Sequence, residues 1–289
     1  LKSDGTVVTW GNSKFGGDSS SVASLLAGVE SIISNSQAFA AIKSDGTVVT
    51  WGKSSSGGNS SSVASQLVNV ESIISTGTAF AALKGNRTVV TWGTRGGDSS
   101  SVADVASIFS NMFAFAALKP DKTVVTWGDQ KSGGNSSIIT VDSSDNIDVE
   151  TSVAGNLTNV ESIFGNNKAF VALKSDGTVV TWGRADHGGN SSIATIGSSN
   201  TITAETSVAG DLIDVELIYS TGTAFAALKS DGTVVTWGNA DKGGDSSSVA
   251  SELVNVESIF NTVNAFAALK SDGTVVTWGD PINGGTGGP

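Results

Sequence analysis

The sequence predicts an all-β protein built from repeated small sheets, and three observations support this. The phrase Thr-Val-Val-Thr-Trp-Gly occurs seven times in the 289 residues. Its copies lie 35, 41 or 55 residues apart, and self-similarity near 40 residues is typical of repeated sheets. Charged residues make up only 15% of the chain while glycines number 36, as expected for short strands joined by tight turns. The phrase contains every tryptophan of the chain: Trp10, Trp51, Trp92, Trp127, Trp182, Trp237 and Trp278.

Each repeat is predicted to contain three strands, and the copy from 29 to 67 illustrates them. A β-branched run at 29–33 predicts the first strand, and Ala-Phe-Ala-Ala-Ile-Lys at 38–43 predicts the second. The small residues of the second strand would let neighbouring sheets approach closely. Asp45-Gly46 then signals a hairpin, because glycine accepts a positive φ without a Cβ clash.

The third strand of this copy, at 47–51, ends in the tryptophan. Val49 and Trp51 share one side of its pleat, since side chains alternate along a strand. We expect each of the seven indoles to have a structural role, packed between adjacent sheets, where a ring of this size buries well over about 150 Å². A Ser-rich segment then places Val63 four residues before Leu67, which predicts a serine-capped helical turn. An outer fourth strand is the alternative.

Two of the repeats are longer, and one is shorter, in the same connection. Insertions at about 136–157 and 191–212 alternate apolar and polar residues around a turn, which predicts an extra outer hairpin in each. The repeat that ends at Trp127 is shortened there instead. Changes of length confined to one connection indicate that this connection lies on the rim of the molecule.

Small antiparallel sheets of this length pack radially into a β-propeller. Seven tryptophan strands are present, but only six strands of the Val-x-x-Ile type and six of the Ala-Phe-x-Ala type. We therefore predict one propeller domain over 1–289 with seven blades, one of them incomplete in this chain because its first strands would precede Leu1. A six-bladed ring with one redundant tryptophan strand is the alternative. The chain is also expected to be part of a longer polypeptide or assembly.

Composition argues against several function classes. A net charge of −11 without a basic run argues against nucleic-acid binding and against docking on anionic lipid. No apolar stretch approaches the roughly 20 residues of a membrane-spanning helix, so we expect no membrane insertion. The absence of cysteine excludes disulfides and thiolate chemistry. An acidic, Ser/Thr-rich, cysteine-free repeat favours a secreted or cell-surface bacterial protein.

No catalytic set is evident, and we expect a protein that is not an enzyme and uses no cofactor. His187 is the only histidine, and despite the adjacent Asp186 we expect it to be an exposed loop residue. No serine lies in a nucleophile-elbow context. Carboxylates cluster in the first insertion, where their oxygens could hold Ca²⁺, but the spacing matches no EF-hand and a solvated hairpin without metal is favoured. That cluster comprises Asp142, Asp145, Asp148 and Glu150.

The repeats differ most between their first two strands, and this variation marks a candidate protein-binding surface. The predicted partner-binding residues are Gln37, Phe109, Met112, Phe113, Phe164, Lys168, Tyr219 and Phe260. Met112 and Phe113 would be exposed, and large exposed apolar groups are typical binding anchors. Drift in unconstrained loops explains the variation at least as well. The linkers that follow the tryptophans vary too and form a second candidate surface.

The phrase Ala-Leu-Lys-Ser-Asp-Gly-Thr-Val-Val-Thr-Trp-Gly, preceded by a Val-x-x-Ile strand, resembles the regulator-of-chromosome-condensation repeat. Within that family it is most similar to bacterial members such as the propeller-type β-lactamase inhibitor protein. The resemblance covers essentially the whole chain and implies a seven-bladed propeller that binds proteins through loops at one end.

Two departures from the family pattern argue against exchange on a Ran-like GTPase. Alanine, as at Ala38, stands where the family often has histidine, and Gly16-Gly17-Asp18 replaces its Gly-Gln-Leu-Gly element. The leading hypothesis is a non-enzymatic module for protein binding or scaffolding, including self-assembly. The alternative is a dedicated inhibitor or regulator that caps a partner with one loop face.

Overall fold

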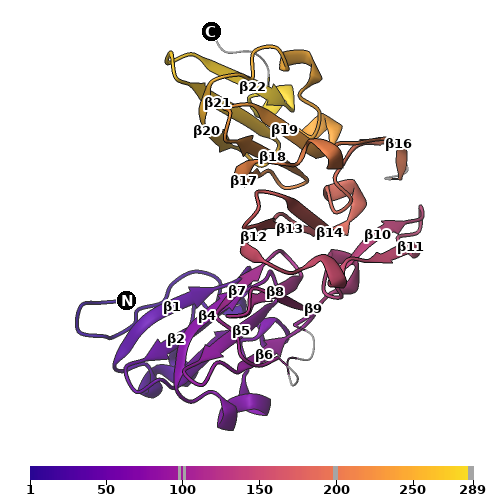
Figure 1. Ribbon diagram of the computed structural model, residues 1–289. Helices are drawn as coiled ribbons and strands as arrows, with labels where there is room; N and C mark the ends of the chain where they lie inside the picture. Colours follow the sequence, from indigo (N-terminus) through magenta and orange to yellow (C-terminus); the bar gives the residue numbers. More distant parts are fainter. Residues whose placement is uncertain (97–98, 100–101, 198–200, 286–289) are drawn as a thin grey trace. The chain divides into compact units, whose positions relative to one another are not determined.

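The computed structural model describes residues 1–96, 99, 102–197 and 201–285, in two compact units (Figure 1). Unit 1 comprises residues 1–120 and 125–129, and unit 2 comprises residues 121–124 and 130–289. The regular structure of the described residues consists of β-strands and short 3-10 helices. None of the helices in these ranges has the length and apolarity needed to cross a membrane.

Unit 1 contains three sheets of three antiparallel strands, each with its Ala-Phe strand in the centre. In chain order the strands are β1 (Val29–Ser34), β2 (Ala38–Lys43), β3 (Val48–Gly52), β4 (Val70–Ser75), β5 (Ala79–Lys84), β6 (Val89–Gly93), β7 (Ser107–Ser110), β8 (Ala114–Leu118) and β9 (Val124–Gly128). These strands follow the predicted three-strand pattern of each repeat, because hairpin turns such as Asp45-Gly46 fix the register of successive strands.

Unit 2 contains two five-stranded sheets and one three-stranded sheet, ordered β11-β10-β14-β13-β12, β16-β15-β19-β18-β17 and β20-β21-β22. The strands are β10 (Ser137–Val141), β11 (Ile147–Ser152), β12 (Val160–Gly165), β13 (Ala169–Lys174), β14 (Val179–Arg184), β15 (Ser192–Ile196), β16 (Ile202–Ser207), β17 (Val215–Ser220), β18 (Ala224–Lys229), β19 (Val234–Asn239), β20 (Val256–Asn261), β21 (Ala265–Lys270) and β22 (Val275–Gly279).

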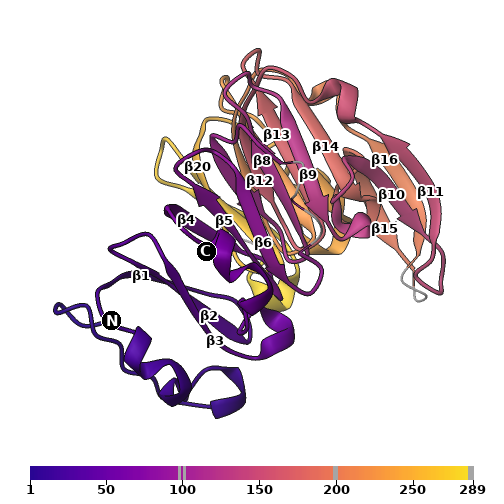
Figure 2. The same cartoon turned by 90° about the horizontal axis from the view of Figure 1, so that it is seen from below.

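The two insertions form the hairpins β10–β11 and β15–β16, whose first strands pair in parallel with β14 and β19 (Figure 2). Each hairpin thus extends one sheet outward beyond its tryptophan strand. Residues 198–200 of the second insertion lie outside the described residues.

Each complete sheet has an aromatic face and an alanine face. In the first sheet, Phe39 and Trp51 are cross-strand partners on the aromatic face, with ring centroids 5.2 Å apart. The same stack recurs in all six sheets at 5.2–5.4 Å. Ala38, Ala40 and Ile42 lie on the alanine face of the first sheet, which packs against the aromatic face of the second. Small side chains on one face therefore accommodate large rings on the next.

Five of the buried indoles, those of Trp51, Trp92, Trp182, Trp237 and Trp278, each donate a hydrogen bond to a carbonyl of the preceding linker. Trp237 Nε1, for example, donates to the carbonyl oxygen of Gly188 at 3.0 Å. Gly188 has a φ of +89°, and a Cβ there would lie 2.9 Å from the ring of Phe225. The first glycine of the Gly-Gly pair is therefore required both by its backbone conformation and by the ring beside it.

The first copy of the phrase departs from the prediction of seven tryptophan strands with buried indoles. Residues 6–10 are not assigned to a strand, and the Trp10 side chain is 83% exposed. The reason is that no Ala-Phe strand lies beside this segment among the described residues. Of the seven indoles, the other six are buried.

In three repeats without an insertion, the Ser-rich segment forms a 3-10 turn, which decides against an outer fourth strand there. Helices η2 (Ser20–Leu25), η4 (Ser61–Gln66) and η10 (Ser247–Val249) lie there. Their N-cap serines make no side-chain capping bond, contrary to expectation. The caps are the Asp or Asn after Gly-Gly: in η4, the Ser61 amide donates to Asn59 Oδ1 at 2.9 Å.

The remaining 3-10 helices follow the tryptophan strands or the hairpins. They are η1 (Ser13–Phe15), η3 (Ser54–Ser56), η5 (Gln130–Ser132), η6 (Ala154–Asn156), η7 (Ala185–His187), η8 (Ala209–Asp211), η9 (Ala240–Lys242) and η11 (Pro281–Asn283).

Candidate functional site

The two sequence-predicted surfaces lie at the same end of each sheet. The antiparallel register pairs Ala38, at the start of β2, with Gly52, at the end of β3. The linker between the first two strands therefore lies beside the linker that follows the tryptophan. Gln37 joins them directly, because its Oε1 accepts hydrogen bonds from Lys53 Nζ at 2.8 Å and from Ser56 Oγ at 3.0 Å.

A fixed turn anchors every linker between the first two strands. In the first copy, Asn35 Oδ1 accepts the backbone amides of Gln37 and Ala38 at 2.9 and 2.8 Å. The equivalent anchor residues are Asn35, Thr76, Asn111, Asn166, Thr221 and Thr262. Sequence reasoning missed this turn, although an Asn or Thr three residues before each Ala-Phe pair was a visible signal.

Backbone bonds join these linkers into a rim within each unit. In unit 1 the Gly77 amide donates to the Met112 carbonyl at 2.8 Å. In unit 2 the Gly222 amide donates to the Val263 carbonyl at 2.7 Å, and the Asn167 amide donates to the Gly222 carbonyl at 3.1 Å. We call these segments the loop rim: residues 34–37, 75–78 and 110–113 in unit 1, and 165–168, 220–223 and 261–264 in unit 2. Because hydrogen bonds fix the backbone of the rim, these linkers are not unconstrained loops. Unconstrained sequence variation is therefore expected only at side chains that point outward.

The rim exposes some of the predicted partner-binding residues and covers others. Met112 is 44% exposed and Phe260 is 61% exposed, whereas the rest of the set is half-buried. Phe113 was expected to be exposed, but the Arg95 guanidinium lies over its ring at 4.9 Å. Val263, which the sequence reasoning missed, is 68% exposed beside Phe260. The half-buried residues are Gln37, Phe109, Phe113, Phe164, Lys168 and Tyr219.

Four residues of that set lie in strands and not in the linkers where the sequence had placed them. Phe109, Phe164, Tyr219 and Phe260 belong to β7, β12, β17 and β20. Phe164 and Tyr219 pack against the hydrophobic seams of unit 2, which explains why they are half-buried. Phe260 lies in the last sheet, and there it remains exposed.

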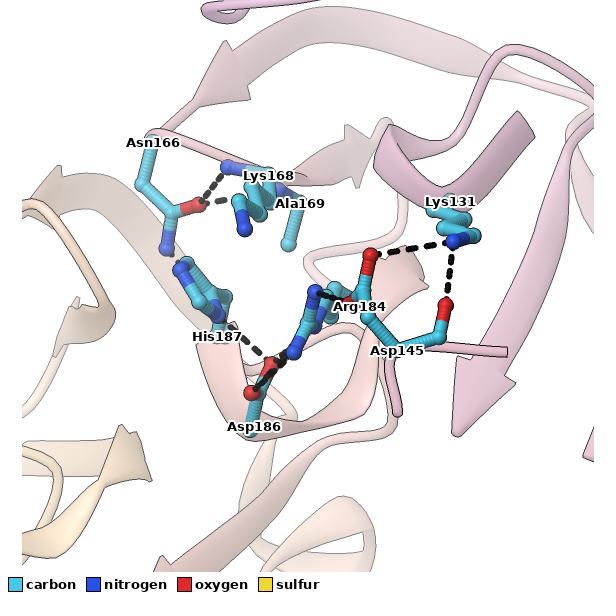
Figure 3. A network of polar contacts seen from close by, with 8 residues as sticks. All are labelled: Lys131, Asp145, Asn166, Lys168, Ala169, Arg184, Asp186 and His187. Atoms are coloured by element: carbon cyan, nitrogen blue, oxygen red, sulfur yellow. Dashed lines mark hydrogen bonds and ion pairs between the residues drawn. The ribbon is translucent and has the colours of Figure 1, made fainter. Parts of the chain in front are cut away.

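A network of charged side chains stands at this end of the first five-stranded sheet (Figure 3). The buried Arg184, at the end of β14, binds Asp186 through Nε at 3.0 Å and Asp145 through Nη1 at 2.6 Å. Lys131 Nζ reaches the other oxygen of Asp145 at 2.9 Å. His187 Nδ1 lies 2.6 Å from Asp186 Oδ1, and its side chain is only 13% exposed. The prediction of an exposed histidine was therefore wrong.

The network holds its carboxylates in the ionised form. Burial would raise the pKa of Asp186, but hydrogen bonds and charge from His187 and Arg184 outweigh it and leave the pKa below the ordinary aspartate value. The hydrogen bond from Lys131, together with the charge of Arg184, lowers the pKa of Asp145. Both oxygens of Asp145 are thus committed to cations. No group of three or more His, Cys, Asp or Glu side chains suited to a metal ion occurs in the part of the chain that the structure describes.

The two hairpins enclose a cavity of about 600 Å³ beside this network. Arg184 and Asp186 lie at its wall, and its lining also includes Asp142, Asp148 and Glu205 together with apolar residues of both hairpins. Position 239, which corresponds to Arg184 in the next sheet, is an asparagine whose side chain accepts the Asp241 amide at 3.1 Å. An arginine thus ties the first hairpin to the end of β14, whereas the equivalent position beside the second hairpin carries an uncharged side chain.

Comparison with known proteins supports the fold. No family model matches the chain, and no curated protein matches it in sequence. Its structure is similar to that of Prp20p from Saccharomyces cerevisiae, described with its binding to Gsp1p and histones, with a TM-score of 0.51 and 15% identity over 87% of this chain and 72% of that one.

Two further structures are similar at 15% identity. Yeast RCC1 (Prp20) bound to Kap60 has a TM-score of 0.49, and the match covers 87% of this chain and 70% of that one. Human WBSCR16 has a TM-score of 0.48, with 89% of this chain and 77% of that one covered. The likeness to Prp20p, together with the repeated antiparallel sheets, shows an all-β fold of the RCC1-like β-propeller kind.

Proposed function

We propose that the chain is a non-enzymatic β-propeller module that binds a protein partner through the loop rim. The observation that carries this proposal is the exposed side chain of Met112 on a rim held by backbone hydrogen bonds. Its carbonyl is fixed by the Gly77 amide, while its side chain is 44% exposed. Presentation on a fixed backbone limits the backbone entropy lost on binding, and the flexible methionine side chain adapts to varied partner surfaces.

The rim of unit 2 supports the same proposal. Phe260 and Val263 are 61% and 68% exposed, within a few residues of each other. Aromatic side chains supply much of the binding free energy at protein interfaces. The chain's net charge of −11 indicates a partner with a basic surface around its apolar contacts. Propellers similar in structure include one described with its binding to Gsp1p and histones, which motivates a protein partner without identifying it.

The wider setting belongs to the same proposal. Composition supports a secreted or cell-surface bacterial protein in which this module serves binding, scaffolding or self-assembly. A dedicated inhibitor that caps one partner is the narrower form, and it rests on the resemblance of the repeat to the propeller-type β-lactamase inhibitor protein.

Site-specific photo-crosslinking tests the rim directly. A photoreactive amino acid replaces Met112 in one variant and Val68 in another. Both positions belong to unit 1, and they are 44% and 42% exposed. Val68 precedes the start of β4, whereas Met112 is bonded to Gly77, which follows the end of β4. In the native host we expect a discrete protein adduct from position 112 and none from position 68. Equal labelling at both positions, or no adduct at 112 or at an equivalent probe at 260, would contradict the proposal.

A further inference from the structure

The aromatic face of the first sheet is incompletely covered. Phe39 and Ile32 are half-buried, whereas their equivalents Phe80 and Ile73 are 0% and 4% exposed. A cavity of about 370 Å³ opens over this face. Its lining includes Val7, Val8, Trp10, Ile32, Phe39 and Trp51.

The segment 2–17 beside this cavity makes several of the hydrogen bonds that the complete repeats make. Thr9 Oγ1 lies 3.0 Å from Ser19 Oγ, as Thr50 Oγ1 lies 3.1 Å from Ser60 Oγ. The Gly5 carbonyl accepts the Val29 amide at 3.1 Å, and Trp51 Nε1 donates to the Gly16 carbonyl at 3.0 Å. The segment is therefore held where a tryptophan strand stands in the other repeats, before any partner strand arrives.

What this site lacks is the alanine face that covers its equivalents. In the four seams within the two units, the aromatic face packs against small and aliphatic residues of the preceding second strand, such as Ala224, Ala226 and Leu228. At the first sheet, among the described residues, the hydrophobic cluster instead includes Val7 and Val22, and no second strand precedes them. Residues 6–10 have no strand partner among the described residues.

We propose that this site binds a β-hairpin of the chain's own repeat type, with a Val-x-x-Ile first strand and an Ala-Phe-x-Ala-Leu second strand. The register of β21 on β22 pairs Phe266 with Trp278 and Ala267 with Thr277. The same register would place the incoming phenylalanine opposite Trp10 and the following alanine opposite Thr9.

The chemistry of the site selects this hairpin over other peptides. The phenylalanine would stack on Trp10, as six stacks in the chain do at 5.2–5.4 Å. On the other face of this strand, small residues on either side of the phenylalanine leave room for Phe39 and Trp51. Backbone bonds to residues 6–10 would supply sequence-independent affinity. The site is separate from the loop rim, so this inference and the proposed function can fail independently.

The test uses the full 289-residue chain and a fluorescein-labelled synthetic peptide with the sequence of residues 256–270. Fluorescence anisotropy is expected to show saturable binding with one peptide per chain. Trp10→Ala in the chain should weaken it at least tenfold, and because Trp10 is 83% exposed the fold should persist. Ala267→Glu in the peptide should weaken it by at least as much. Val68→Asp, at an exposed position of the same unit, should leave the affinity unchanged.

Three results would overturn the proposal. The first is no binding at millimolar peptide to chain whose circular dichroism shows it folded. The second is binding that neither Trp10→Ala nor the peptide variant weakens. The third is a concentration-dependent dimer of the chain, seen by sedimentation, that Trp10→Ala dissolves and the peptide does not displace, because the occupant would then be a second copy of the chain.

Discussion

Two aromatic faces of this molecule have the same side chains and different surroundings. Phe225 and Trp237 are each 0% exposed, enclosed by the alanine face of the preceding sheet. Phe39 and Trp51 stack at nearly the same distance, yet Phe39 is half-buried beside an open cavity. The stack therefore forms within one sheet, whereas its burial depends on the next sheet. The free energy of unfolding should accordingly depend mainly on the packing between neighbouring sheets.

The largest expected effect comes from removing one ring from each face. Phe225→Ala should lower the free energy of unfolding by about 3–5 kcal/mol, the usual cost of a cavity at a buried phenylalanine. Phe39→Ala should cost about 1–2 kcal/mol, because part of its surface is already in water. Urea unfolding followed by circular dichroism measures both. Equal losses would show that the first face is covered as fully as the others.

Enlarging a small residue on each alanine face should have a smaller effect. Ala226 is 0% exposed inside a seam, and Ala226→Leu should destabilise by about 1–3 kcal/mol through overpacking. Ala267 is half-buried in the last sheet, so Ala267→Leu should change stability by less than about 0.5 kcal/mol. Differential scanning calorimetry compares the two variants. If Ala267→Leu proved as costly as Ala226→Leu, the last alanine face would not be open.

The indole hydrogen bonds give a third contrast. Trp237 Nε1 donates to Gly188, but the buried Trp127 Nε1 has no partner among the described residues. Both Trp→Phe variants lose similar volume, and only the one at 237 also leaves a carbonyl unpaired. We expect it to be less stable than the variant at 127 by about 1 kcal/mol. Equal urea midpoints for Trp237→Phe and Trp127→Phe would show that the indole hydrogen bond does not stabilise the packing between sheets.

The smallest effect concerns the two outer hairpins. Since the pKa of Asp145 is lowered by Lys131 and Arg184, its contribution to stability is present above the ordinary aspartate pKa and is lost as pH falls through the lower folded value. Asp145 is largely exposed, so the effect should stay below about 1 kcal/mol. Hydrogen exchange should show β10–β11 losing protection below about pH 4 while β15–β16 changes less. In Asp145→Asn the two hairpins should respond alike.

The sequence predicted the strands well and the surfaces poorly, for identifiable physical reasons. Strand order and the indole seams follow from local alternation and from turns such as Asp45-Gly46, which adjacent residues determine. The covering of Phe113 by Arg95 and the burial of His187 depend on residues brought together by strand pairing, which no local pattern reveals. Trp10 shows the same limit, since its phrase is identical to the other six, yet among the described residues no Ala-Phe strand lies beside it and its side chain is exposed.

The central claim is that the tryptophan segment at 6–10 is open to a partner strand, whereas the other six tryptophan strands are enclosed. Hydroxyl-radical footprinting of all seven tryptophans tests this claim most directly. Oxidation should be fast at Trp10, which is 83% exposed, and slow at Trp182 and Trp237, which are 0% exposed. Protection of Trp10 equal to that of Trp237 in the isolated chain would contradict the account.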